Sequence, residues 1–203
     1  PHATEVFENN CIPMFFIDGT FHNTNFYDGL LIQLSSKHGF GGVLPLIAAW
    51  MPVENKENFV FFLITMKVMG FDIEKIPFMT DRGPLLSAVR YLYEFRHIEI
   101  SVKFCTEHII RNIVKVHNIP KSDIQTLRQI VTGCQQATKL EVYLSNVDKL
   151  KNYFLMNGNE IIIYIMSIHP RHWCVMGNLE QLTDNIWLPG YMAKLKHCIS
   201  QHK

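Results

Sequence analysis

The sequence carries almost no net charge, which limits how it can bind nucleic acid. Its 203 residues include 19 Lys and Arg against 18 Asp and Glu, a formal net charge of +1 at pH 7. A domain that binds nucleic acid through its own surface is usually more basic than this. We therefore expect any nucleic-acid partner to be held by a local basic patch or by a domain outside this chain.

A regular cysteine framework and long apolar runs are also missing. The five cysteines, an odd number without regular spacing, predict reduced thiols and an intracellular setting. The longest apolar stretches, FVFFLITMKVM and IIIYIMSI, are too short to cross a bilayer, so we expect no membrane partner. No signal peptide is visible, and the start at Pro1 suggests an excised fragment.

The first part of the chain predicts an antiparallel meander. Hydrophobic residues make up 48% of the sequence, which is ample for one core. Segments 14–22, 25–36 and 43–53 each have the apolar pattern of a strand, and their connections are short. Pro45 predicts an edge position for the third strand because proline cannot donate to a ladder.

Helices and short strands alternate in the next part. A helix is predicted between Asn55, which can cap it, and Gly70, which can end it. Its expected buried face holds Phe59, Phe62, Leu63, Met66 and Val68. A strand at IPFMTD, a helix at GPLLSAVRYLYEF, a strand at ISVKFC and a helix at TEHIIRNIVKVHN follow. Strands joined through helices imply parallel pairing with right-handed crossovers.

After Pro120 the spacing becomes helical. SDIQTLRQIVTGCQQA and TKLEVYLSNVDKLKNYFLM predict helices, IIIYIMSI fits a buried helix or a strand, and a final helix follows a loop. The sequence thus predicts an α/β fold with a mixed five-stranded sheet, flanking helices and a helical insertion before the last helix. The predicted parts are a core at 1–118, the insertion at 119–172 and a C-terminal segment at 173–203 that completes the core.

Two acidic residues stand in apolar strands. Asp18 lies within MFFIDGTFH, and Asp81 ends IPFMTD. The fourth strand can lie beside the first, and neighbouring strands are about 4.8 Å apart, so the two carboxylates can form a pair. Such a pair repels itself unless a cation lies between, and Mg²⁺ prefers oxygen ligands of this kind. In the alternative interpretation, Asp81 caps the following helix and Asp18 hydrogen-bonds in a turn with Thr20.

Four segments between residues 15 and 112, about half of the chain, resemble the catalytic domain of Mutator-like (MULE) transposases. They are FFIDGTFH, VLPLIAAWMPVENKENFVFFL, MTDRGPLLSAV and FCTEHIIRN, in the family's order. The resemblance implies a ribonuclease H-like fold and a DDE/D site in which Asp18 and Asp81 are catalytic acids and metal ligands. It also implies Mg²⁺ or Mn²⁺. Two such ions about 3.5 to 4 Å apart can activate a water and stabilise the leaving oxygen in phosphodiester cleavage.

The third acid departs from the family's pattern. The family's glutamate should follow TDN, but in TDNIWLPGYMAKL the expected position falls on Leu188 or Pro189. Glu180, in GNLEQL, is the candidate third catalytic acid if the register slips. The alternatives are that the acid is lost or that it lies beyond Lys203.

A C-x-x-H pair, Cys105 and His108, follows the last predicted core strand. Two such residues are half of a tetrahedral Zn²⁺ site, and His197 and His202 can supply the other half. Alternatively, Cys105 is a small buried apolar residue and His108 hydrogen-bonds near the acids. The sequence leaves both interpretations open.

The resemblance implies metal-dependent cleavage of double-stranded DNA at transposon ends and strand transfer into target DNA. The alternative is a domesticated, catalytically inactive scaffold or interaction module, which the departure at the third acid favours. A generic ribonuclease H-like nuclease is a third option, against which the inserted helices and the C-x-x-H pair argue. The family also implies a nuclear location, a zinc-finger-type DNA-binding domain outside this chain, and a homodimer as one form of assembly.

Overall fold

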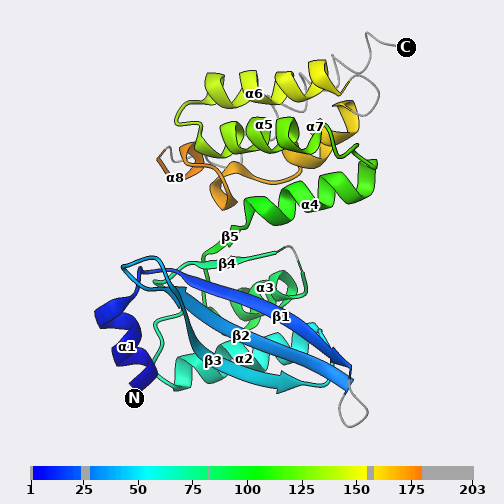
Figure 1. Ribbon diagram of the computed structural model, residues 1–203. Coiled ribbons are helices and arrows are strands. Elements are labelled where there is room, and N and C mark those ends of the chain that lie inside the picture. The colour runs from blue at the N-terminus through cyan, green and yellow to red at the C-terminus, as the bar shows by residue number, and fades with distance from the viewer. Residues whose placement is uncertain (1, 24–27, 82, 155–157, 180–203) are drawn as a thin grey trace. The chain divides into compact units, whose positions relative to one another are not determined.

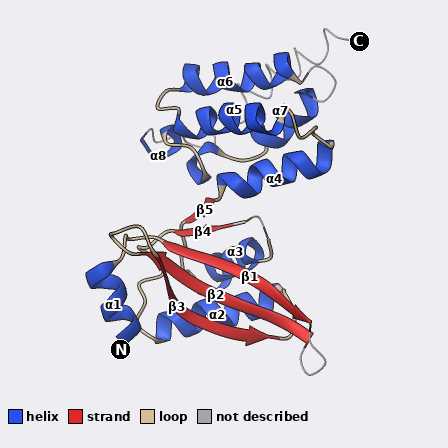
Figure 2. Ribbon diagram, in the orientation of Figure 1, coloured by secondary structure: helices blue, strands red, loops and turns tan. Residues whose placement is uncertain are grey.

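The chain divides into two compact units, Pro1–Cys105 and Thr106–Lys203. The computed structural model describes residues 2–23, 28–81, 83–154 and 158–179 (Figure 1). All five strands belong to the first unit, and the second unit is helical in its described part (Figure 2). The first unit ends before the predicted core boundary at 118, and the three-part division predicted from the sequence stays a prediction.

The strands form one mixed sheet in the order β3-β2-β1-β4-β5. Their bounds are β1 Phe15–Asn23, β2 Asp28–Lys37, β3 Val43–Met51, β4 Phe78–Thr80 and β5 Val102–Phe104. The first three strands pair antiparallel, whereas β4 pairs parallel with β1 and β5 parallel with β4. This is the mixed five-stranded, ribonuclease H-like sheet that the sequence predicts.

The edge position predicted from Pro45 is confirmed, because β3 is an outer strand of the sheet. The ladder passes from the pair Leu34–Ile47 to the pair Ser35–Pro45 and so skips Leu46. A bulge of this kind, on an edge strand, accommodates a residue that has no N–H to donate.

Alternation along the strands gives the sheet one buried face. Ile17 pairs with Leu34 and both are buried, whereas Asp18 pairs with Gln33 on the opposite, more exposed face. The buried face is built around Phe15. Its ring lies 4.6 Å from that of Phe7 and 5.1 Å from that of Phe78, measured between centroids.

Two helices of the first unit, α2 (Lys56–Val68) and α3 (Leu85–Arg96), pack against each other and lie behind the sheet in Figure 1. Asn55 caps α2 as predicted, since its Oδ1 accepts the N–H of Asn58 at 2.9 Å. Gly70 follows the helix with a φ of 94°, in the left-handed region that favours glycine, and ends it as predicted.

The predicted buried face of α2 is confirmed for Phe59, Phe62, Leu63 and Met66. It is wrong for Val68, which is 82% exposed. Val68 lies about 200° around the helix from Met66, so it points away from the face that the sheet buries. A further helix, α1 (His2–Asn10), has no counterpart among the predicted elements, and it reaches the core through Phe7.

The helical unit begins with α4 (Thr106–His117) and continues with α5 (Ile124–Gln136), α6 (Leu140–Tyr153) and α7 (Gly158–Met166). A 3-10 turn at Pro170–His172 and a short α8 (Met176–Leu179) follow. IIIYIMSI thus lies mainly in a helix, the first of its two predicted alternatives. The final helix predicted within 173–203 lies beyond the last described residue. No helix in the described ranges is both long and apolar enough to span a membrane.

Candidate active site

The two aspartates singled out in the sequence are aligned across neighbouring strands. β1 and β4 run parallel, with Phe15 paired to Phe78 and Phe16 to Met79. The same offset, continued along the chain, aligns Asp18 with Asp81. Because β4 ends at Thr80, Asp81 is the first residue beyond the strand, where the backbone is free to turn. Parallel pairing therefore brings together two acids that lie far apart in the sequence.

Backbone groups fix the orientation of both carboxylates. The Oδ1 atom of Asp18 accepts the N–H of Gly19 at 2.9 Å, and the Oδ1 atom of Asp81 accepts the N–H of Gly83 at 3.2 Å. The carbonyl of Thr80, one residue before Asp81, accepts the N–H of Cys105 at 3.0 Å and so ties the end of β4 to the end of β5. The alternative that Asp81 caps α3 stays a prediction: the residue before Leu85 is Pro84, without a side-chain cap bond, while Asp81 accepts the N–H of Gly83 just before the helix.

A third carboxylate, Glu54, lies at the same place. It follows β3 and precedes Asn55, the cap of α2. Burial raises the pKa of the Glu54 carboxyl above its ordinary value, and the negative charges of Asp81 and then Asp18 raise it further. A Cβ atom built on Gly83 would lie 3.0 Å from Oδ1 of Asp81 and 3.4 Å from Oε1 of Glu54, so these two acids flank one small glycine.

Sequence reasoning assigned no role to Glu54. The glutamate of PVENKENF is part of the resemblance, but its spacing from the aspartates carries no signal that they meet. One sequence feature does point to Glu54. It lies where a predicted strand meets a helix with a predicted cap, beside the predicted sheet that holds both aspartates.

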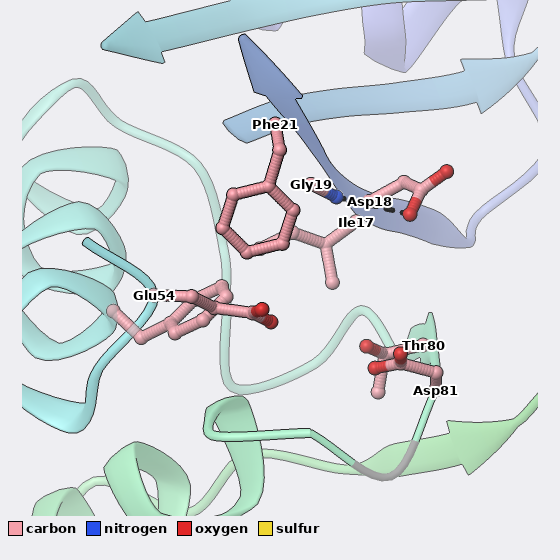
Figure 3. Close-up of a pocket in the computed structure, with 8 residues that line it drawn as sticks. Ile17, Asp18, Gly19, Phe21, Glu54, Thr80 and Asp81 are labelled. Atoms are coloured by element: carbon pink, nitrogen blue, oxygen red, sulfur yellow. Dashed lines mark hydrogen bonds between the residues drawn. The ribbon is translucent and has the colours of Figure 1, made fainter. Parts of the chain in front are cut away.

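The three acids line one pocket of about 150 Å³ (Figure 3). Its other lining residues are Ile17, Gly19, Phe21, Phe59 and Thr80, so no basic side chain is among the lining residues that the structure describes. In Figure 3 the carboxylates of Glu54 and Asp81 face the space between them, while that of Asp18 turns toward the Gly19 N–H on the other side of β1. A pocket with acids and no base attracts cations.

The donor set fits a hard divalent cation. Mg²⁺ is commonly bound by one or two carboxylates together with water and substrate phosphates. Asp81 faces the pocket, and Asp18 would complete the pair if its carboxylate turned from the Gly19 N–H. Within the described ranges no three His, Cys, Asp or Glu side chains form a group that could hold a metal on its own. The site therefore offers open carboxylate ligation and leaves the remaining positions to water or substrate.

The other predicted site residues are not brought to the pocket by the described structure. Glu180, the candidate third acid, lies outside the described residues, as do His197 and His202. Cys105 ends the first unit and His108 belongs to the second. The buried Nδ1 atom of His108 has no hydrogen-bond partner among the described residues. A Zn²⁺ site at this pair finds no support there, given the absence of any group of three ligands.

No protein-family model and no curated protein matches the sequence. Among solved structures, the chain is similar to one in the intasome of simian T-cell lymphotropic virus in complex with the PP2A regulatory subunit B56 gamma. The identity is 14% over 57% of this chain and 46% of that one, less than half of its length, with a TM-score of 0.34.

The chain is also similar to the HTLV-2 integrase catalytic core domain in complex with magnesium. For the trimeric form the identity is 17% over 63% of this chain and 88% of that one, with a TM-score of 0.31. For the dimeric form it is 17% over 65% and 93%, with a TM-score of 0.29. At such identities and TM-scores the likeness carries no argument about activity, which must rest on the residues of the pocket.

Proposed function

We propose that this chain is a transposase-type catalytic domain that cleaves double-stranded DNA and transfers strands with the help of divalent metal ions. The alignment of Asp18 with Asp81 across two parallel strands, at one acidic pocket, carries the proposal. The MULE-like segments around both aspartates support the assignment to that class of transposase. A nuclear location belongs to the same proposal.

In this proposal Asp18 and Asp81 bind Mg²⁺ or Mn²⁺. Two ions are bound when a third acid also serves as a metal ligand. The bound metal would activate the attacking water or hydroxyl and stabilise the leaving oxygen of the phosphodiester. The chain's own contribution is to hold the two carboxylates in place through the N–H groups of Gly19 and Gly83. Glu54 adds negative charge beside Asp81, and Glu180 is the proposed third ligand.

The test is a plasmid-nicking assay with Mn²⁺, followed by a strand-transfer assay with cleaved ends. Wild type should nick, and Asp18→Asn and Asp81→Asn should each reduce the rate by at least about 100-fold, since each change removes a ligand of the metal that would activate the attacking water. Asp148→Asn is the matched control, because it removes one exposed carboxylate of α6, outside the pocket. Nicking that persists in both pocket variants would contradict the proposal.

A second candidate is a domesticated scaffold without catalysis. One specific observation favours it: the position where the family has its glutamate falls on Leu188 or Pro189, and neither side chain can bind a metal. A chain that binds Mn²⁺ at the aspartates but neither nicks nor joins DNA would favour this second function.

A further inference from the structure

The two units carry formal charge of opposite sign. Residues 1–105 hold 8 Lys and Arg against 11 Asp and Glu, whereas residues 106–203 hold 11 against 7. Formal charges of −3 and +4 thus make up the +1 of the chain. The unit with the acidic pocket repels a phosphate backbone at long range, and the helical unit attracts one. By formal charge, the helical unit is therefore the more attractive of the two for a polyanion.

Basic side chains of the helical unit gather along α4 and just beyond it. Arg111 and Lys115 are both exposed and lie four residues apart on α4, so they are neighbours on its surface. Lys121 is exposed shortly after the helix ends. We call these three residues the α4 stripe. None of them takes part in an ion pair within the part of the chain that the structure describes.

Three acids lie on α4 or next to it: Glu107, Asp123 and Glu160. Glu107 lies one turn before Arg111, but it pairs with Arg128 of α5. The Oδ1 atom of Asp123 lies 3.1 Å from the Oγ of Ser122, which donates to it, and 3.5 Å from the Tyr153 hydroxyl. Because both hydroxyls are neutral, Asp123 keeps its charge and offsets part of that of Lys121. Glu160 of α7 lies 3.3 Å from His117 of α4. Arg111 and Lys115 thus carry the charge of the stripe that no ion pair within the described residues engages.

We propose that the α4 stripe binds the phosphate backbone of double-stranded DNA. The inference rests on the proposed function, because double-stranded DNA is the substrate class proposed there. Exposed Lys and Arg side chains bind phosphates without reading the bases, so this contact is independent of sequence and sensitive to salt. Each phosphate that is neutralised adds about 0.9 to the slope of log K against log salt concentration.

The test measures binding of the 203-residue chain to a fluorescently labelled DNA duplex by anisotropy, between about 50 and 200 mM salt. EDTA is present, so metal-dependent cleavage plays no part. Arg111→Gln, Lys115→Gln and Lys121→Gln should each reduce the slope by about 0.9, and the triple variant by up to about 2.7. Lys139→Gln is the matched control, since Lys139 is exposed and lies at the start of α6. Circular dichroism verifies that each variant is folded.

Three results would overturn the inference: an unchanged slope in the triple variant, an equal loss at Lys139, or binding to vesicles of anionic phospholipid but not to the duplex. The outcomes separate this inference from the proposed function. Salt-dependent binding through the stripe, in a chain that binds no Mn²⁺ at Asp18 and Asp81, would contradict the proposed activity and support the stripe. Mn²⁺ binding at Asp18 and Asp81, together with an unchanged salt slope in the stripe variants, would support the proposed activity and contradict the role of the stripe.

Discussion

Glu54 is a single residue on which the charges of both aspartates act. Its pKa is raised above the ordinary value of 4.5, first by burial and then by Asp81 and Asp18. Because the folded state raises this pKa, the ionised carboxylate disfavours folding. This unfavourable contribution is absent below the ordinary pKa, grows as the pH rises through the raised pKa, and is fully present above it.

We therefore expect Glu54→Gln to raise the Tm at pH 7 by about 1 to 2 °C, a small effect typical of partly exposed sites, and to leave it unchanged near pH 4. Thermal unfolding of wild type and variant at the two pH values checks this. The same Tm difference at both pH values would show that the charge of Glu54 is not the cause.

Gly83 provides a second test at the scale of one residue. A Cβ atom at this position would crowd the carboxylates of Asp81 and Glu54, at 3.0 and 3.4 Å, so Gly83→Ala should displace one of them. Gly42→Ala is the matched control, because its added Cβ would meet nothing within 4 Å. We expect the affinity for Mn²⁺, measured by calorimetry, to fall several-fold in the first variant only. Equal affinities in the two variants would contradict the expected displacement of a carboxylate by the added methyl group.

At the level of elements, the cap of α2 stands directly after Glu54. The Oδ1 atom of Asn55 accepts the N–H of Asn58, and Glu54 is the preceding residue. Asn55→Ala should lower the free energy of unfolding by about 1 kcal/mol. Lys139→Ala is the control, since this residue stands at the start of α6 without a side-chain cap bond. Urea unfolding that gives the two variants equal losses would argue against the cap.

Most elements follow from local patterns, and the exceptions have physical reasons. The meander follows from the alternation of apolar residues along its strands. The edge position of β3 follows from the missing N–H of Pro45, and α2 begins after its cap, Asn55, and ends before Gly70. IIIYIMSI remained ambiguous because a short run that is apolar on every side fits a helix or a strand. The helix α1 was missed because its only buried large apolar side chain is Phe7, which leaves a faint pattern.

Only the part of the site that strand pairing brings together could be predicted from the sequence. Asp18 and Asp81 each end or interrupt an apolar run, and the predicted strand order makes them neighbours, as the register of β1 and β4 bears out. Their catalytic role stays a prediction. Glu54 could not be found in this way, because its approach to Asp81 depends on how the chain turns from β3 into α2, and spacing does not encode that turn.

At the scale of the whole molecule, two units with separate cores should lose stability separately. Leu63 of α2 and Leu127 of α5 are both fully buried, one in each unit. A Leu→Ala change at such a site costs about 2 to 5 kcal/mol. We expect Leu63→Ala to speed amide hydrogen exchange mainly in residues 1–105, and Leu127→Ala mainly in the described part of 106–203. Faster exchange throughout the chain in either variant would mean that the two units unfold as one.

Asp18 and Asp81 should bind a divalent metal ion together, and calorimetric titration of Mn²⁺ into the chain measures this binding. We predict that wild type binds Mn²⁺, that Asp18→Asn and Asp81→Asn each abolish the binding, and that Asp148→Asn leaves it unchanged. If wild type binds no Mn²⁺, or if both pocket variants bind it as wild type does, the aspartates are structural and the account is contradicted.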